Sequence, residues 1–364
     1  MDFSFGADAE MVRSTVHEFV RRELLPQEPK FLNAREPAER VEIIRAATHA
    51  LKELGIYSAG VPEKFGGGGL GPIETCLIAE ELSQTLIPVD WGEPTPILYE
   101  CSDAQKPQYL LPVVHGDKRY ALAFLEPEHF AEPAGMQTTA EPTATGYLLN
   151  GTKQLSRPDF DFCLVFARTQ EGISCFILDK DAPGSTVRTR QGAAQDRTLL
   201  VLDNCPVLKE RLLGEPGGAM SLGRDWFGLS RLIRSAAILG VCQRLVAVTA
   251  QYAKDWTSMG EHISERPAVQ RTVAEMAGDI EALRWLVYHT AWLAAEGKNV
   301  NFDSLLTKLQ AQRVLQKAVT DSVRVHGGTI PPAEHWLVRA SQEGEALDML
   351  RLAVCQQVIA AYTS

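Results

Sequence analysis

The sequence predicts an α+β protein in which a small β-rich region lies between two helical regions. Helical apolar spacing runs to about residue 116, and short apolar runs separated by Pro, Gly, Asn and Asp follow from Lys118. Long helical periodicity returns from about Trp226. We therefore expect an N-terminal helical domain over residues 1–117, a central antiparallel β domain over 118–222 and a C-terminal helical bundle over 223–364.

The N-terminal helices are expected from apolar residues that recur on one helical face. The spacing i, i+4, i+7, i+8 is carried by Val12, Val16, Phe19 and Val20. The same spacing recurs over residues 41–54, where Gly55 follows as a plausible C-cap. After a glycine-rich loop, Pro72 opens another expected helix over residues 73–82, since proline is tolerated in a first helical turn.

The strands and the later helices are expected from their length and their punctuation. Five short runs predict strands: Tyr120–Phe124, Tyr147–Leu149, Cys163–Ala167, Ser174–Leu178 and Leu199–Leu202. Three longer periodic segments predict helices over residues 241–252, 269–293 and 304–325. The pairs Gly327-Gly328 and Pro331-Pro332 interrupt the helical pattern before a last expected helix.

Composition limits the classes of function. The 364 residues are 45% hydrophobic and 23% charged, which excludes a mostly disordered chain and favours two or three packed units. The 36 basic against 46 acidic residues give a net charge of −10, a poor match to nucleic acid or to an anionic membrane surface.

Cysteine spacing and the N-terminal residues indicate the cellular compartment in which the protein is expected. The seven cysteines are scattered and none forms a C-x-x-C pair, so neither a metal site nor a redox pair is expected. The first residues carry acids early, and no apolar run approaches the roughly 20 residues that cross a bilayer. We expect a cytoplasmic protein with reduced thiols.

Several short motifs lie in order along the chain. In the C-terminal third, residues 230–240 (SRLIRSAAILG) match x-R-x-x-x-A-A-x-x-x-G, and Tyr252-Ala253 follows as in Y-A-x-x-R-x-Q-F-G. In the N-terminal half, residues 55–69 (GIYSAGVPEKFGGGG) match G-x-x-x-x-x-x-P-E-x-x-G-G-x-G. Between them stand Glu126-Pro127, as in T-E-P, and Asn150-Gly-Thr-Lys153, as in N-G-x-K. Together these motifs resemble the acyl-CoA dehydrogenase family over nearly the whole chain.

That resemblance implies an oligomeric flavoprotein that acts on an acyl-CoA or acyl-carrier-protein thioester. In this family a carboxylate takes a proton from Cα, and FAD takes a hydride from Cβ. Hydrogen bonds to the thioester carbonyl acidify the α-proton, and exclusion of water from the site strengthens the electrostatic interactions there. FAD carries the electron chemistry while the protein positions the substrate.

The chain departs from the family at positions that hold the flavin. Leu125 replaces the threonine of T-E-P and offers no side-chain hydrogen bond. The aromatic-and-threonine segment after N-G-x-K becomes Gln154-Leu-Ser156-Arg157-Pro. Ser156 and Arg157 are candidate donors to a flavin there, and the alternative is that they are solvent-facing strand residues.

The second set of departures lies in the C-terminal third. The arginine of Y-A-x-x-R-x-Q-F-G, which in the family reaches a neighbouring subunit's FAD pyrophosphate, falls on Trp256, and its phenylalanine falls on Met259. An indole does not replace the charged fork of a guanidinium. His326, Gly327 and Gly328 match the family's glycine pair, but the residues after them differ.

Different alignments of the C-terminal residues with the family pattern place the catalytic base at different positions. Local sequence favours Glu343 in Gln-Glu-Gly, whereas spacing from an arginine favours Asp348. A gap-free count from the glycine pair lands on Arg351, and both carboxylates are alternatively solvated surface groups. Arg231 matches a family position that sets the environment of the base, or it is a structural arginine.

Three hypotheses follow. The first is a subunit of a heteromeric acyl-CoA dehydrogenase, in which a second, similar chain supplies part of the flavin site. The second is a self-sufficient homotetrameric FAD enzyme. The third is a flavin-free protein that binds or scaffolds an acyl thioester. In each case we expect a homo- or hetero-oligomer that binds neither nucleic acid nor a membrane.

Overall fold

The computed structural model describes residues 4–92, 96–127, 135–190, 197–327 and 354–355. These residues form two compact units. The first unit gathers Met1–Gly60, Gly68–Trp91 and Phe227–Ser364, and the second gathers Val61–Gly67 and Gly92–Trp226. The expected three-domain boundaries stay a prediction. The last expected helix lies outside the described residues.

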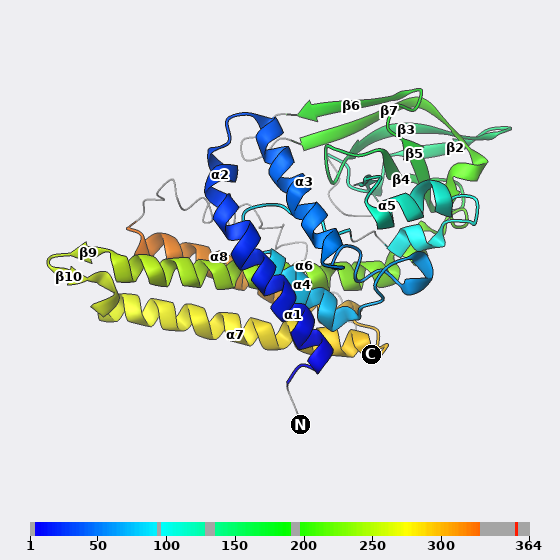
Figure 1. Cartoon of the computed structure of the whole chain (residues 1–364). Helices are drawn as coiled ribbons and strands as arrows, with labels where there is room; N and C mark the ends of the chain where they lie inside the picture. The colour runs from blue at the N-terminus through cyan, green and yellow to red at the C-terminus, as the bar shows by residue number, and fades with distance from the viewer. Residues whose placement is uncertain (1–3, 93–95, 128–134, 191–196, 328–353, 356–364) are drawn as a thin grey trace. The chain divides into compact units, whose positions relative to one another are not determined.

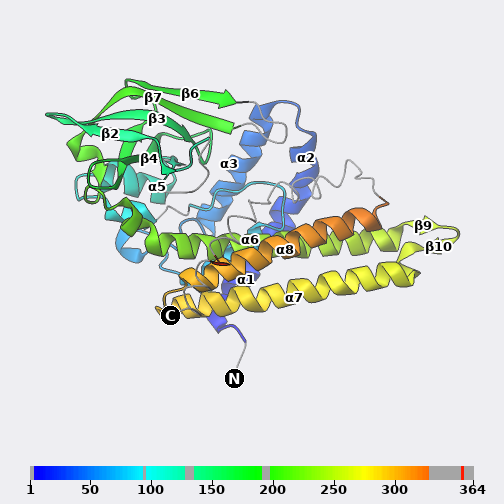
Figure 2. The same ribbon diagram turned by 180° about the vertical axis from the view of Figure 1, so that it is seen from behind.

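Helices build the first unit, and Figures 1 and 2 show them from opposite sides. Its helices are α1 (Ala7–Phe19), α2 (Glu28–Asn33), α3 (Pro37–Glu53), α4 (Pro72–Leu82), α6 (Ala219–Asp255), α7 (Pro267–Ala295) and α8 (Asn301–Val325), of which α6 begins in the second unit. A short hairpin of β9 (Thr257–Ser258) and β10 (Glu261–His262) joins α6 to α7. The expected helices over 41–54, 73–82 and the three C-terminal segments are confirmed.

Burial follows the apolar spacing of the sequence. All four residues of the first expected helical face, Val12, Val16, Phe19 and Val20, are buried. They pack with residues of α3 and α4 such as Leu51 and Ile78. Gly55 follows α3 with φ +70° and donates its N–H to the Lys52 carbonyl, as expected of a glycine that ends a helix.

A buried polar cluster joins α4 to α6 and α7. Glu80 is 1% exposed and accepts a hydrogen bond from Gln243 Nε2 at 2.8 Å. Its carboxylate also accepts from Arg284 and from the Tyr288 hydroxyl. Burial, followed by the nearby Glu80 charge, raises the pKa of Tyr288, which therefore stays a donor. Because these three side chains donate hydrogen bonds to it, the Glu80 carboxylate is tolerated in the core of the helical unit.

Helix α6 is long and apolar enough to cross a bilayer by length and composition alone. This property belongs to Phe227–Asp255, and 61% of its most apolar window is buried inside the protein. Leu232, Leu239 and Leu245 pack there with residues of α4, α7 and α8. Packing of this kind accounts for the apolar composition of α6. The expectation of no membrane association stays a prediction.

The second unit is built on one eight-stranded sheet. Along it the order is β6 (Ser185–Arg190), β7 (Arg197–Leu208), β3 (Gly146–Gln154), β2 (Thr139–Pro142), β4 (Phe162–Arg168), β5 (Ile173–Asp179) and β8 (Leu212–Leu213). The remaining strand, β1 (Tyr120–Ala123), pairs with β4 off this path. The short helix α5 (Leu111–His115) precedes β1.

The expectation of a purely antiparallel sheet is wrong in one respect. Strand β1 pairs parallel to β4, and β2 meets β4 in a parallel bridge at Thr139 and Arg168. Apolar alternation predicts which segments are strands but carries no information on their direction. Strands β2 and β6 escape the sequence analysis because they expose polar side chains and lack an apolar run.

A close contact between α4 and α6 depends on Gly240. A Cβ added there would lie 1.9 Å from the Glu80 carbonyl oxygen, a backbone atom that cannot rotate away. We expect Gly240→Ala to lower the free energy of unfolding by about 3 kcal/mol or more, because α4 and α6 must separate. Urea denaturation followed by circular dichroism measures this loss.

Gly278→Ala in α7 is the matched control, because a Cβ there meets nothing within 4 Å. That substitution should raise the free energy of unfolding by about 0.5–1 kcal/mol through helix propensity. Equal effects of the two substitutions would contradict the close contact.

Candidate functional site

An ion pair buried in the second unit joins two of the motifs. Lys153 Nζ donates to Glu126 Oε1 at 3.0 Å and to the Phe124 carbonyl oxygen at 3.1 Å. The Lys153 side chain is fully buried and that of Glu126 is 6% exposed. The motifs T-E-P and N-G-x-K, separate in sequence, therefore meet as one charged pair in the interior.

The Glu126 carboxylate is held by three further donors. Thr138 donates to Oε1 through its backbone N–H at 2.8 Å and through its hydroxyl at 2.6 Å. The Gln137 N–H donates to Oε2 at 2.8 Å. Both oxygens are thus satisfied, as a buried carboxylate requires.

The two charges respond differently to this environment. Burial alone would raise the pKa of Glu126, but the bonds from Thr138, Gln137 and Lys153 lower it from 4.5 to about 2. Burial lowers the pKa of Lys153 from 10.5 to about 8, against the opposing effect of Glu126. The pair is therefore ionised at neutral pH.

Each polar or glycine position of N-G-x-K has a structural role. Asn150 Oδ1 accepts the Asn204 N–H at 2.7 Å. Gly151 has φ +143° at a register shift in β3, and a Cβ there would lie 2.8 Å from Thr138 Cα. Glycine lets β3 approach Thr138, which binds Glu126. The motif thus positions the turn at Leu125.

The predicted flavin contacts of the second unit lie together at the end of β3. The Leu125 carbonyl accepts the Gln154 N–H at 2.8 Å. Ser156 is exposed, and its Oγ accepts the Leu122 N–H at 2.8 Å. Arg157 is half-buried beside it. The structure therefore brings Leu125, Ser156 and Arg157 into one neighbourhood, while their contact with a flavin stays a prediction.

A three-ring stack occupies the predicted pyrophosphate position in the first unit. The Trp256 ring stacks on Tyr252 with centroids 5.6 Å apart and planes 13° apart. Tyr252 stacks in turn on His326 at 4.0 Å and 30°. His326 is 2% exposed and its Nδ1–H donates to the Ser322 carbonyl at 2.6 Å, whereas Trp256 is 55% exposed. The stack thus runs from a buried imidazole to an open indole.

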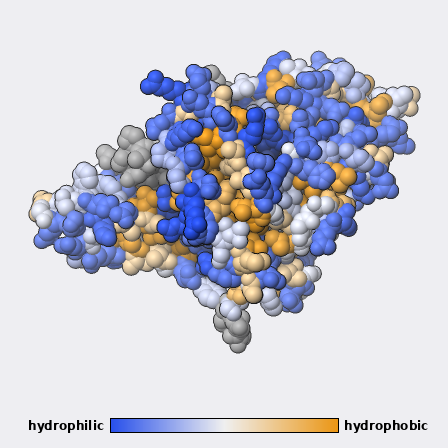
Figure 3. Space-filling model, in the orientation of Figure 1, coloured by the Kyte–Doolittle hydropathy of each residue, from blue (hydrophilic) through white to orange (hydrophobic). Residues whose placement is uncertain are grey.

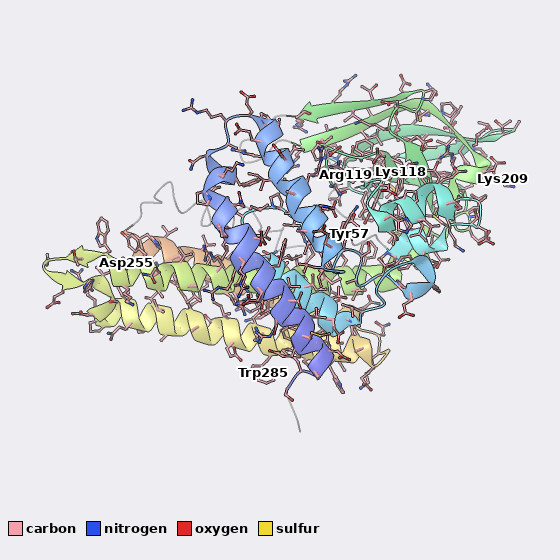
Figure 4. The ribbon with its side chains drawn as sticks, viewed as in Figure 1. Tyr57, Lys118, Arg119, Lys209, Asp255 and Trp285 are labelled. Atoms are coloured by element: carbon pink, nitrogen blue, oxygen red, sulfur yellow. The ribbon has the colours of Figure 1, made fainter. Side chains whose placement is uncertain are left out.

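The hairpin after the stack holds Trp256 in place. The Trp256 N–H donates to the Tyr252 carbonyl at 2.9 Å, and the Trp256 carbonyl accepts from Ile263 at 3.0 Å. Met259 lies at the hairpin tip with φ +58° and is 97% exposed. Asp255, labelled in Figure 4 at the end of α6, accepts two hydrogen bonds from the Gln251 amide.

The remaining predicted residues are placed unevenly. Arg231 is half-buried on α6, and its guanidinium lies 5.7 Å from the centre of the Phe227 ring. Gly327 follows α8 with φ +73°. Gly328, Glu343 and Asp348 lie outside the described residues. Within the described ranges, no group of three His, Cys, Asp or Glu is placed to hold a metal ion.

The resemblance implies a bound flavin. The residues around the Leu125 turn in the second unit suit a flavin better than the aromatic stack of the first unit does. Near the Leu125 turn, Gln154 Oε1 is buried and accepts no hydrogen bond from any described group, so it has capacity for a ligand N–H. The stack offers aromatic faces, and Trp256 carries no charge for a phosphate. Gln154 is not among the residues predicted from the sequence, although its place directly after Lys153 in a strand was a usable signal.

Comparison with known proteins supports one family over most of the chain. The family models described as the acyl-CoA dehydrogenase N-terminal, middle and C-terminal domains match residues 6–117, 121–205 and 220–342. The (R)-benzylsuccinyl-CoA dehydrogenase of Thauera aromatica is 30% identical over 357 residues, covering 90% of this chain and 88% of that protein.

Two other similar proteins bear on assembly and cofactor. The caffeyl-CoA reductase–Etf complex subunit CarC of Acetobacterium woodii is 26% identical and covers 89% of each chain. A Bacillus anthracis acyl-CoA dehydrogenase, whose crystal structure is a complex with FAD, superposes with a TM-score of 0.85 at 27% identity. That superposition covers 99% of this chain and 68% of the other.

Removing one member of the buried ion pair should destabilise the second unit. Glu126→Gln leaves the Lys153 ammonium buried without a counter-charge, so we expect the free energy of unfolding to fall by about 3–5 kcal/mol at pH 7. The double variant Glu126→Gln/Lys153→Met should regain part of this loss, because no unpaired charge remains. Urea denaturation of the single and double variants measures both effects.

The dependence of stability on pH under acidic conditions gives an independent check of the ion pair. Because the folded-state pKa of Glu126 is depressed, its contribution is fully present above about pH 4.5 and is lost as the pH falls through about 2. The stability difference between wild type and Glu126→Gln should shrink over that range. A difference that does not change with pH would contradict the ion pair.

Proposed function

This chain belongs to the acyl-CoA dehydrogenase family, and we propose that it is one subunit of a heteromeric, cytoplasmic flavoenzyme that dehydrogenates an acyl thioester. The family supports an oxidoreductase that acts on a CH–CH bond, with FAD as cofactor. When bound, FAD accepts the hydride that leaves Cβ. The observation that carries the heteromeric part of the proposal is the three-ring stack at Trp256.

The stack supports pairing of unlike chains because Trp256 takes the place of an arginine that the family uses across a subunit interface. In the family, the arginine at the Trp256 position reaches the pyrophosphate of a neighbouring subunit's FAD. In a homo-oligomer every copy of this chain would present an indole at that position, so no copy would supply the guanidinium. A second chain that retains the arginine would complete the site on this chain. The CarC relative, named as a subunit of a complex, is consistent with unlike partners.

The surface of α7 offers a further reason to expect assembly. Trp285 and Trp292 are 52% and 45% exposed and stand seven residues apart, so they lie on the same side of the helix. Figure 3 shows apolar side chains at the surface of the helical unit, and Figure 4 shows Trp285 projecting outward from α7. Large exposed aromatic residues of this kind are typical of protein interfaces.

The substrate in this proposal is an acyl-CoA thioester, and carrier-protein attachment is the alternative. The relative from Thauera aromatica is named for an acyl group that bears an aromatic ring, so an aryl-substituted acyl-CoA is the first substrate to test. Glu343 and Asp348 remain the candidate bases for the α-proton. Arg231 is the candidate neighbour of that base.

Flavin content tests the role of Trp256. The chain purified alone should retain little FAD, and Trp256→Arg should bind FAD about tenfold more tightly, because a charge-assisted hydrogen bond contributes about 1.5–3 kcal/mol. Trp256→Phe, which keeps a ring without a charge, is the matched control and should behave as wild type. The visible absorption of the purified proteins, with FAD titrations, measures these differences.

Co-expression with an acyl-CoA dehydrogenase-like chain that keeps the arginine tests the assembly. The complex should be yellow and should reduce an electron acceptor with an aryl-substituted acyl-CoA. A colourless, inactive complex would contradict the proposal. Full flavin content and turnover by the wild-type chain alone would instead establish the self-sufficient enzyme. Thermal stabilisation by acyl-CoA but not by FAD would favour the flavin-free binding protein.

A further inference from the structure

Helix α1 packs over a carboxylate that belongs to α4. The Glu81 side chain is 5% exposed, and its Oε2 lies 2.9 Å from His17 Nδ1 on α1. Figure 1 shows α1 lying across α4 in the helical unit. Beside this contact, Val16 of α1 is buried in the same apolar cluster as Ile78 of α4. Glu81 therefore owes part of its burial to α1, and movement of α1 away from α4 would hydrate it.

Neutral amides join this carboxylate to the polar cluster of the helical core. Gln84 Nε2 donates to Glu81 Oε2 at 2.9 Å and lies 3.4 Å from Gln243 Oε1 on α6. Gln243 in turn donates to Glu80, the residue before Glu81, at 2.8 Å. The two adjacent carboxylates of α4 therefore belong to one hydrogen-bonded network.

The two carboxylates differ in the kind of base that faces them. Glu80 accepts a hydrogen bond from Arg284 on α7, and a guanidinium keeps its charge across the accessible pH range. Glu81 faces His17, and an imidazole is charged only when it carries a second proton. The charge of the His17–Glu81 pair therefore depends on pH, whereas that of the Arg284–Glu80 pair does not.

A second contact attaches the start of α1 to the same network. The Phe5 ring, just before α1, meets the Tyr288 ring edge-on, with centroids 4.8 Å apart and planes at 67°. The Tyr288 hydroxyl donates to Glu80. Both ends of α1 are therefore joined to the Glu80–Glu81 pair, one through an aromatic contact and the other through His17.

Charged groups on both helices act on Glu81. On α1 these are His17 and Arg13, and Arg13 also donates to Glu10 at 3.0 Å. On α4 it is Glu80, whose negative charge opposes ionisation of Glu81. Helix α6 faces the pair with the neutral amide described above, and α7 with the guanidinium that Glu80 already binds. The imidazole is thus the titrating group of α1 in direct contact with Glu81.

Burial makes the folded chain hold a proton at Glu81 more tightly than the unfolded chain does. Burial raises the pKa of Glu81 above its ordinary value of 4.5, and this effect outweighs the hydrogen bond with His17, which lowers the pKa. A group with a raised pKa in the folded state stabilises the fold below its unfolded-state pKa, and this stabilisation is lost as the pH rises through the folded-state value. The α1–α4 contact should therefore weaken as the pH rises above about 4.5.

We propose that the docking of α1 on α4 is sensitive to pH, because His17 and Glu81 share a proton that holds α1 in place and that is lost as the pH rises. With this proton present, the buried carboxylate is neutralised or offset by an imidazolium. Without it, a bare carboxylate is left under α1, and its hydration favours opening. Glu80 keeps its arginine throughout, so the change is confined to the α1 side of the network.

Hydrogen exchange of the α1 amides measures this docking directly. The full chain is exchanged at about pH 5, pH 6.5 and pH 8, and the rates are corrected for the intrinsic pH dependence of amide exchange. The protection of α1 should fall by about tenfold from pH 5 to pH 8, while that of α8 should change little. Equal protection of α1 at the three pH values would overturn the proposal.

Substitution of the carboxylate assigns the effect to the pair. Glu81→Gln removes the titrating group but keeps an oxygen that accepts a hydrogen bond from His17, so the protection of α1 should become independent of pH. His49→Gln is the matched control, because His49 lies 3.5 Å from Glu53 at the surface of α3, with side chains 72% and 70% exposed. This control should leave the pH dependence of α1 unchanged.

Substitution of the imidazole gives a second test that leaves the buried carboxylate in place. His17→Gln keeps an N–H donor but holds no second proton. The protection of α1 in this variant should match wild type at about pH 8 and should be several-fold lower than wild type at about pH 6.5. A variant as protected as wild type at all three pH values would contradict the shared proton. So would a wild-type pH dependence that persists in Glu81→Gln, with folding of each variant checked by circular dichroism.

Discussion

The architecture of the candidate site depends on the buried ion pair between Glu126 and Lys153. A lysine with no exposed side-chain surface is tolerable only beside a fully satisfied carboxylate, and Glu126 achieves this with donors from Thr138 and Gln137. The pair ties the turn after β1 to the end of β3. The positions of Leu125, Gln154 and Ser156 therefore depend on this ion pair.

This dependence gives the family motifs a structural role in a chain that differs from the family at Leu125 and Trp256. The glutamate of T-E-P, and the glycine and lysine of N-G-x-K, hold the backbone, so their loss would cost stability whatever the chain binds. Leu125 and Trp256 occupy positions whose family roles concern FAD. Replacing them leaves the core intact, because neither takes part in the ion pair or in the Glu80 cluster of the helical unit.

The two units carry different residues at positions that the family uses for FAD. In the sheet unit, the Glu126–Lys153 ion pair and the Gln154 N–H bond to the Leu125 carbonyl hold the turn at Leu125 against the end of β3. In the helical unit, Trp256 stands at the position of the family's arginine and forms an aromatic stack with Tyr252 and His326. The proposed pairing with an unlike chain rests on the exposed indole of Trp256.

The sequence by itself determined the helices, most strands and the family, because apolar spacing and local motifs depend on residues close together in the chain. Val12, Val16, Phe19 and Val20 are buried as their spacing requires, and Gly55 ends α3. Only the tertiary structure decided that β1 runs parallel to β4, that Glu126 meets Lys153 and that Trp256, Tyr252 and His326 stack. Strand direction and register join segments far apart in sequence, and alternation specifies neither.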